Sequence, residues 1–131
     1  SGVIGEVGNH TPLTENMRKV LRASAQAQVE TGAPILIHPG IHPDTPLEII
    51  KVLTGAGAKA ENVIMGHLDN IRPMSAIKEL ADTGCYLEYD RFATTAIVEA
   101  AANDAYRVRR QYVVNREIKG KIVAVLAEEV K

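Results

Sequence analysis

The feature that most constrains the fold is a short aliphatic run that ends at a glycine or a Pro-Gly pair and carries one polar side chain near its end. The clearest case is Ile35-Leu36-Ile37-His38, which Pro39-Gly40 stops at once. A run this short and this apolar is typical of a buried strand. The same pattern occurs in residues 3–8, which carry Glu6, and in residues 63–69, which carry His67.

Helical patterns separate these predicted strands. Apolar residues recur at three- and four-residue spacing from Leu13 to Val29, and Gly32 follows as a stop signal. Thr11-Pro12 has the pattern of an N-cap followed by proline at the first helical position. The spacing therefore predicts a helix that begins near residue 12 and buries Val20 and Val29 with the other apolar residues.

The rest of the chain continues the alternation. Residues 45–48, Thr-Pro-Leu-Glu, form a capping-box pattern that predicts a second helix, and residues 73–84 predict a third. Residues 85–90 alternate as a fourth strand does, and residues 95–115 carry a long helical pattern. The tail, residues 121–131, fits a strand or a helix equally well.

Strand and helix thus alternate with a repeat of about 30 residues, the length of one βα unit. We predict the α/β class with parallel strands, in one domain spanning residues 1–131. A doubly wound sheet and a segment of a (β/α)8 TIM-type barrel share this local pattern. No G-x-G-x-x-G or Walker sequence joins a strand to a helix, which weighs against a nucleotide-binding sheet.

The carboxyl ends of parallel strands meet at one edge of a sheet, where α/β proteins place their chemistry. Glu6, His38 and His67 would meet there. Two imidazoles and a carboxylate suit zinc, manganese or iron, with zinc favoured, and three protein ligands leave positions for water and a small-molecule substrate. Any one of these histidines, taken alone, could equally be a hydrogen-bonded structural residue.

Other polar residues fall near the same edge. Asp90 and Arg91 follow the fourth predicted strand and would face the site, although a surface ion pair is the alternative. Asp69 could cap the next helix or orient an imidazole. His10 and His42 lie in loops next to helix starts, where we expect exposed or capping roles.

Composition narrows the classes of partner. The 15 basic and 16 acidic residues nearly balance, and the basic residues between 107 and 121 form one face of an amphipathic helix, so nucleic-acid binding is not expected. No apolar run approaches the roughly 20 residues that span a bilayer, so no membrane partner is expected either. The single cysteine, Cys85, suits a reducing compartment, and we expect a cytoplasmic protein.

Four segments in register carry a resemblance to a known family. They are residues 2–8 (GVIGEVG), 34–40 (PILIHPG), 66–69 (GHLD) and 84–92 (GCYLEYDRF). Together they resemble the phosphotriesterase-related branch of the amidohydrolase superfamily, which includes phosphotriesterases and phosphotriesterase-like lactonases. The resemblance implies the fourth to seventh βα units of a distorted (β/α)8 barrel with a binuclear metal centre.

The resemblance also implies roles. Glu6 matches the family's metal-bridging glutamate on the fourth strand, and His38 and His67 match the metal-binding histidines that end the fifth and sixth strands. Asp90 and Arg91 would then line the substrate mouth. The chain departs from the family pattern because it has no His-x-His pair and no aspartate after Asp104.

Two functional hypotheses follow. The first is a metal-dependent hydrolase that acts on an ester, lactone, amide or phosphotriester through metal-activated water. The alternative is a catalytically inactive barrel fragment that binds a single metal or small ligand, or serves only in assembly. About half of a barrel cannot close alone, so we expect a portion of a larger barrel or a homodimer that completes it.

Overall fold

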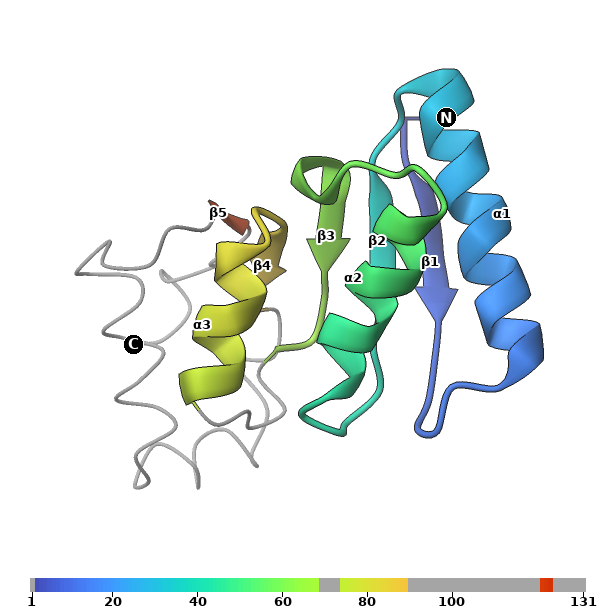
Figure 1. Cartoon of the computed structure of the whole chain (residues 1–131). Coiled ribbons are helices and arrows are strands. Elements are labelled where there is room, and N and C mark those ends of the chain that lie inside the picture. Colours follow the sequence, from blue (N-terminus) through green and yellow to red (C-terminus); the bar gives the residue numbers. More distant parts are fainter. Residues whose placement is uncertain (1, 69–73, 90–120, 124–131) are drawn as a thin grey trace.

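The computed structural model describes residues 2–68, 74–89 and 121–123. These residues form one sheet of five parallel strands, in the order β1-β2-β3-β4-β5, and α1, α2 and α3 lie side by side on one of its faces (Figure 1). The strands are β1 (Ile4–Gly8), β2 (Ile35–His38), β3 (Val63–Met65), β4 (Tyr86–Glu88) and β5 (Lys121–Val123). The helices are α1 (Glu15–Thr31), α2 (Thr45–Gly55), the 3-10 turn η1 (Ala60–Asn62) and α3 (Met74–Asp82).

The core lies between the sheet and the helices. Side chains alternate across β2, β3 and β4, and those on the helix side are fully buried while their neighbours are only partly buried. On these three strands the buried set is Ile35, Ile37, Val63, Met65 and Leu87, and the partly buried apolar and aromatic set is Leu36, Ile64 and Tyr86. The sheet therefore has one face packed against helices and one face left less covered.

This arrangement confirms the predicted α/β class with alternating βα units and parallel strands. Sequence neighbours pair with one another throughout, as they do in a (β/α)8 barrel, where each strand lies beside the next one in the chain. The order does not reverse anywhere among the described strands, whereas a doubly wound sheet reverses at its switch point. The described residues thus favour the barrel segment.

The first helix begins later than the sequence predicted. Its N-cap is Thr14, whose side-chain oxygen accepts a hydrogen bond from the Met17 amide at 3.2 Å, so Thr11 is not the cap. Gly32 ends the helix in the left-handed conformation, with φ of 72°, as expected. Val20 and Val29 are exposed, which corrects their predicted burial.

The capping box predicted for the second helix is wrong. Asp44 is the N-cap of α2 and makes no side-chain capping bond. Thr45 is buried instead, with its hydroxyl 2.5 Å from that of Thr11 in the loop before α1, and Glu48 pairs with Arg18 of α1. Both side chains form contacts between helical units, which sequence spacing alone does not reveal.

The other predictions about the chain have different outcomes. Residues 121–123 form a strand, which settles that part of the ambiguous tail, whereas the helix predicted for residues 95–115 lies outside the described residues.

Cys85 is buried, and burial raises the pKa of its thiol to about 11, as suits a small core residue. Within the described segments, no helix is both long and apolar enough to cross a membrane. The single-domain and cytoplasmic assignments stay predictions.

Gln28 links α1 to the segment before β3. Its Nε2 donates to the Asn62 carbonyl at 3.0 Å, and its Oε1 accepts from the Lys59 amide at 2.7 Å, inside the core. We expect Gln28→Ala to lower the free energy of unfolding by about 1–3 kcal/mol, because two backbone groups lose their partner. Urea denaturation measures this. Gln26→Ala, at an exposed position of the same helix, should change it by less than about 0.5 kcal/mol, and equal effects of the two substitutions would contradict the assignment.

Candidate metal centre

Glu6, His38 and His67 converge at the carboxyl edge of the sheet. Glu6 Oε1 lies 2.6 Å from His67 Nε2 and 3.5 Å from His38 Nδ1. The two imidazole rings meet edge to face, with centroids 4.5 Å apart. One ligand atom from each residue falls within 4.8 Å of the other two. The three side chains therefore converge, as the sequence predicted.

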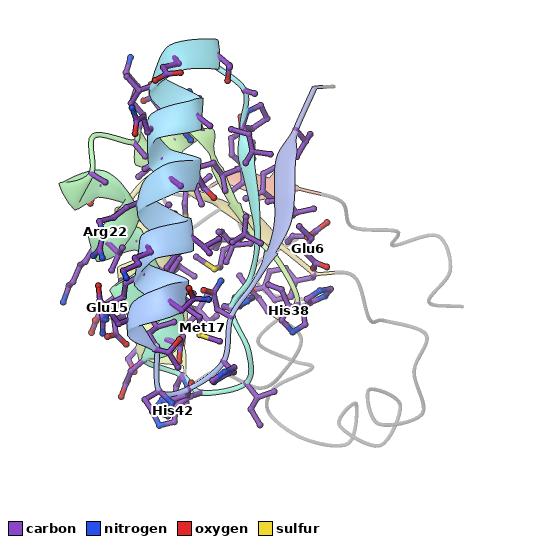
Figure 2. All side chains as sticks on the ribbon, turned by 90° about the vertical axis from the view of Figure 1, so that its right-hand side faces the viewer. Glu6, Glu15, Met17, Arg22, His38 and His42 are labelled. Carbon is purple, nitrogen blue, oxygen red and sulfur yellow. The ribbon has the colours of Figure 1, made fainter. Side chains whose placement is uncertain are left out.

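The side chains point away from the helices. Figure 2 shows Glu6 and His38 together on the side of the strands opposite α1, whereas Met17 projects from α1. The side chains of Glu6, His38 and His67 are 44%, 36% and 16% exposed. The cluster is thus open to solvent on the less covered face of the sheet, and a small molecule can reach it.

A β-bulge sets the direction of Glu6. Ile4 pairs with Ile35 and Val7 pairs with Ile37, so three steps along β1 match two steps along β2. Ile4 and Val7 both pack against the core. In a regular strand Glu6 would share the face of Ile4, and the extra residue turns it to the opposite face.

Gly5 makes this bulge possible. Its φ is +114°, and a Cβ there would lie 2.5 Å from the Leu36 carbonyl oxygen. Only glycine fits such a position. Because Glu6 emerges on the open face, it does not carry the desolvation cost of a carboxylate buried inside an aliphatic strand.

His67 is held by backbone bonds on both sides. The Gly66 amide donates to the Ile37 carbonyl of β2 at 2.9 Å, and the Leu68 amide donates to the Glu88 carbonyl of β4 at 3.1 Å. Between them His67 has φ of +54°, a left-handed conformation that costs a non-glycine residue about 1–3 kcal/mol. Such strain concentrates at functional sites, where flanking contacts maintain it.

The donor set fits a divalent metal ion. Two imidazole nitrogens and one carboxylate oxygen are ligands that zinc, manganese and iron share, and three protein ligands leave coordination positions open. Both imidazoles lie close to the same carboxylate oxygen, Glu6 Oε1. The arrangement can therefore hold a metal ion and leave it accessible to water and substrate.

The remaining predicted residues do not join this cluster. His10 is exposed, and His42 is an exposed loop residue whose Nδ1 accepts from the Asp44 amide at 3.3 Å, so His42 has the local role expected of it. Asp69, Asp90 and Arg91 lie outside the described residues. The substrate-mouth role of Asp90 and Arg91 stays a prediction.

Two residues of the site carried no predicted role. Asn9 is buried beside His38 and donates to its carbonyl. Glu88 ends β4, and its carboxylate lies against Gly66, the residue before His67. The sequence shows only that Asn9 and Glu88 are polar residues at or next to a strand end. It does not reveal their contacts, because each contact joins residues of different strands.

Comparison with known proteins identifies the family of the chain. A model of the phosphotriesterase family matches residues 1–129. The chain belongs to this family. The resemblance expected from its four segments is thereby confirmed, and members of the family are metal-dependent.

Similar proteins are considerably longer than this member. It is 42% identical over 130 residues to the N-acetyltaurine hydrolase of Rattus norvegicus, with 93% of the chain and 37% of the rat protein covered. It is 52% identical over 92 residues to a phosphotriesterase-related protein of Nematostella vectensis, with 70% and 26% covered. The chain thus spans about a third of the length of these relatives.

Solved structures agree on the fold. The phosphotriesterase homology protein of Escherichia coli, crystallised with phosphate in its active site, superposes with a TM-score of 0.74 at 24% identity, covering 93% of this chain and 42% of that one. The organophosphorus hydrolase of Deinococcus radiodurans gives 0.75 at 22% identity, covering 93% and 37%. These likenesses establish that this phosphotriesterase-family chain has the fold of part of a barrel.

Gly66 offers a test of the site's packing in this family member. A Cβ at Gly66 would lie 2.9 Å from the Ile37 carbonyl oxygen and 2.8 Å from Glu88 Oε2. Glu88 can rotate away, but the strand carbonyl cannot. We expect Gly66→Ala to lower stability by about 1–3 kcal/mol and to weaken metal binding, because the strand ends that carry both histidines must separate.

Thermal unfolding and zinc titration measure the two effects. Gly8→Ala is the matched control, since it places the same methyl group at the same edge of the sheet in open space. If Gly66→Ala and Gly8→Ala behave alike in both measurements, the packing described around His67 is incorrect.

Proposed function

We propose that this chain carries metal-binding residues of a hydrolase of the phosphotriesterase family, with Glu6, His38 and His67 as ligands of a divalent cation, zinc by preference. The observation that supports this most is the convergence of three ligand atoms, from three adjacent strand ends, within 4.8 Å of one another. Membership of a metal-dependent family supports the same assignment.

Glu6 and the two histidines would have different roles in binding the cation. Glu6 supplies the negative charge that a cation needs, and its Oε1 already lies close to both imidazoles. The two neutral imidazoles leave the bound cation with net positive charge, which favours an electron-rich carbonyl or phosphoryl oxygen as ligand. A bound ion would supply Lewis acidity and a water that ionises near neutral pH.

An amide is the substrate class that the relatives favour. The rat, mouse and human proteins named N-acetyltaurine hydrolase are 42%, 49% and 49% identical to this chain in the matched regions. Phosphotriesters and lactones are the alternatives within the same chemistry. We therefore propose hydrolysis of an N-acyl amide as the first reaction to test.

Metal titration tests the site directly. Zinc binding, followed by competition with a chromophoric chelator, should weaken about 100-fold or more in Glu6→Ala, His38→Ala and His67→Ala, because each removes one ligand. His10→Ala and His42→Ala are the controls, since both lie in loops outside the cluster, and they should bind as the unaltered chain does. Uniform affinity across all five variants would refute the proposed ligand set.

A hydrolysis screen separates the two functional hypotheses. The metal-loaded chain is tested with N-acetyltaurine, a lactone and a phosphotriester, with Glu6→Ala as the inactive control. Turnover that disappears in the control supports the hydrolase. Tight metal binding without turnover of any substrate supports the alternative, a fragment that binds a metal but does not catalyse.

Assembly belongs to the same proposal. The partly buried side chains Leu36, Ile64 and Tyr86 lie on the face of the sheet opposite the helices, where the remaining strands of a barrel would close over them. A homodimer in which a second copy contributes that cover remains our proposal for the isolated chain, as does its cytoplasmic location.

A further inference from the structure

Asn9 is the buried polar residue nearest to the end of β2. It directly follows β1 and is only 6% exposed. Its backbone amide donates to the His38 carbonyl at 2.9 Å, and its side-chain Nδ2 points at the same oxygen from 3.4 Å and at the Val7 carbonyl from 3.0 Å. Asn9 therefore joins the ends of the strands that carry Glu6 and His38.

The carbonyl it holds is the last one of β2. The next residue is Pro39, which has no amide hydrogen and cannot continue the ladder. The orientation of the His38 peptide thus depends on what donates to its oxygen. Fixing that peptide fixes the direction in which the Cα–Cβ bond of His38 leaves the strand.

The surroundings leave Asn9 little freedom. Gly40, just after Pro39, has φ of +74°, and a Cβ there would lie 3.2 Å from the Asn9 carbonyl oxygen and 3.3 Å from the His10 Cα. The loop after β1 and the loop after β2 therefore pack backbone against backbone. A change in the Asn9 side chain is expected to move the end of β2 with it.

The hydrogen bonds of Asn9 differ from those of a residue that serves stability alone. Gln28 is also a buried amide, and both of its ends have backbone partners. Asn9 Oδ1, in contrast, is buried without a partner among the described residues. Leaving a buried acceptor unpaired costs about 1–3 kcal/mol. The unpaired Oδ1 therefore offsets much of the stability that the two bonds of Nδ2 contribute.

We propose that Asn9 is a positioning residue for the metal site, which holds His38 in the orientation that meets Glu6 and His67 by donating to the His38 carbonyl. This inference rests on the proposed role of His38 as a ligand. Asn9 acts through the backbone of His38 and contacts neither metal nor substrate. Residues that orient a ligand typically change metal affinity 10–100-fold when replaced.

Cobalt and zinc binding by the full chain test the proposal, with Asn9→Ala as the principal variant and Gln28→Ala as the matched control. Asn9→Ala should bind zinc about 10-fold more weakly and should shift the visible absorption bands of bound cobalt, because the His38 carbonyl keeps the backbone donor of residue 9 but loses the side-chain donor that also ties it to Val7. Gln28→Ala should lower thermal stability to a similar degree and leave zinc affinity and the cobalt spectrum unchanged. A role in stability alone would move the melting temperature and not the spectrum.

Asn9→Asp provides a second variant of nearly the same shape, in which a carboxylate oxygen replaces the donor and faces two carbonyls. It should weaken zinc binding at least as much as Asn9→Ala. If either Asn9 variant folds and binds zinc as the unaltered chain does, with the same cobalt spectrum, the proposal is overturned. It is also overturned if neither variant folds, because Asn9 would then be a structural residue. Failure of the unaltered chain to bind metal would instead refute the proposed function.

Discussion

The parallel pairing of β1, β2 and β3 is the constraint on which the site depends. The carboxyl ends of parallel strands lie at one edge of the sheet. The strand pairing alone therefore brings a polar residue at the end of each strand beside those of its neighbours. The pairing of Gly8 with His38 sets the first two strands, and the bond from Gly66 to Ile37 sets the third against the second. Glu6, His38 and His67 meet because these backbone bonds align the strand ends. The side chains add little to that alignment, since Glu6 and His38 are substantially exposed and their direct interactions are worth little in water.

The two edges of the sheet serve different needs. At the amino edge, Gln28 satisfies two backbone groups inside the core, as expected of an edge that contributes stability. At the carboxyl edge, the chain accepts local costs: His67 has a left-handed backbone, Gly5 opens a bulge, and Asn9 Oδ1 is buried without a partner among the described residues. Each of these costs accompanies a specific direction of a side chain in the cluster. Strain that is tied to side-chain direction in this way is typical of functional sites.

Sequence predicted the elements and the cluster better than it predicted the contacts that hold them. The aliphatic runs gave β1, β2 and β3, and strand-end logic brought Glu6, His38 and His67 together, because both depend on local pattern and on a general rule of parallel sheets. The predicted helix caps at Thr11 and at Thr45 with Glu48 are wrong. The two threonine hydroxyls contact each other, and Glu48 pairs with Arg18, so contacts between helical units replace the local capping bonds. The bulge at Gly5 and the role of Asn9 could not be predicted, since both depend on how one strand meets another. Asp90 and Arg91 remain predictions that rest on their place after the fourth strand and on the family resemblance, because both lie outside the described residues.

The central claim is that one cation binds between Glu6, His38 and His67. Anomalous diffraction from a zinc-loaded crystal, measured on both sides of the zinc absorption edge, locates the ion without reference to activity. We expect one strong peak about 2.0–2.2 Å from a carboxylate oxygen of Glu6 and from a nitrogen of each imidazole. A peak at the exposed loop residues His42 and Asp44, with none between the three strand ends, would contradict it.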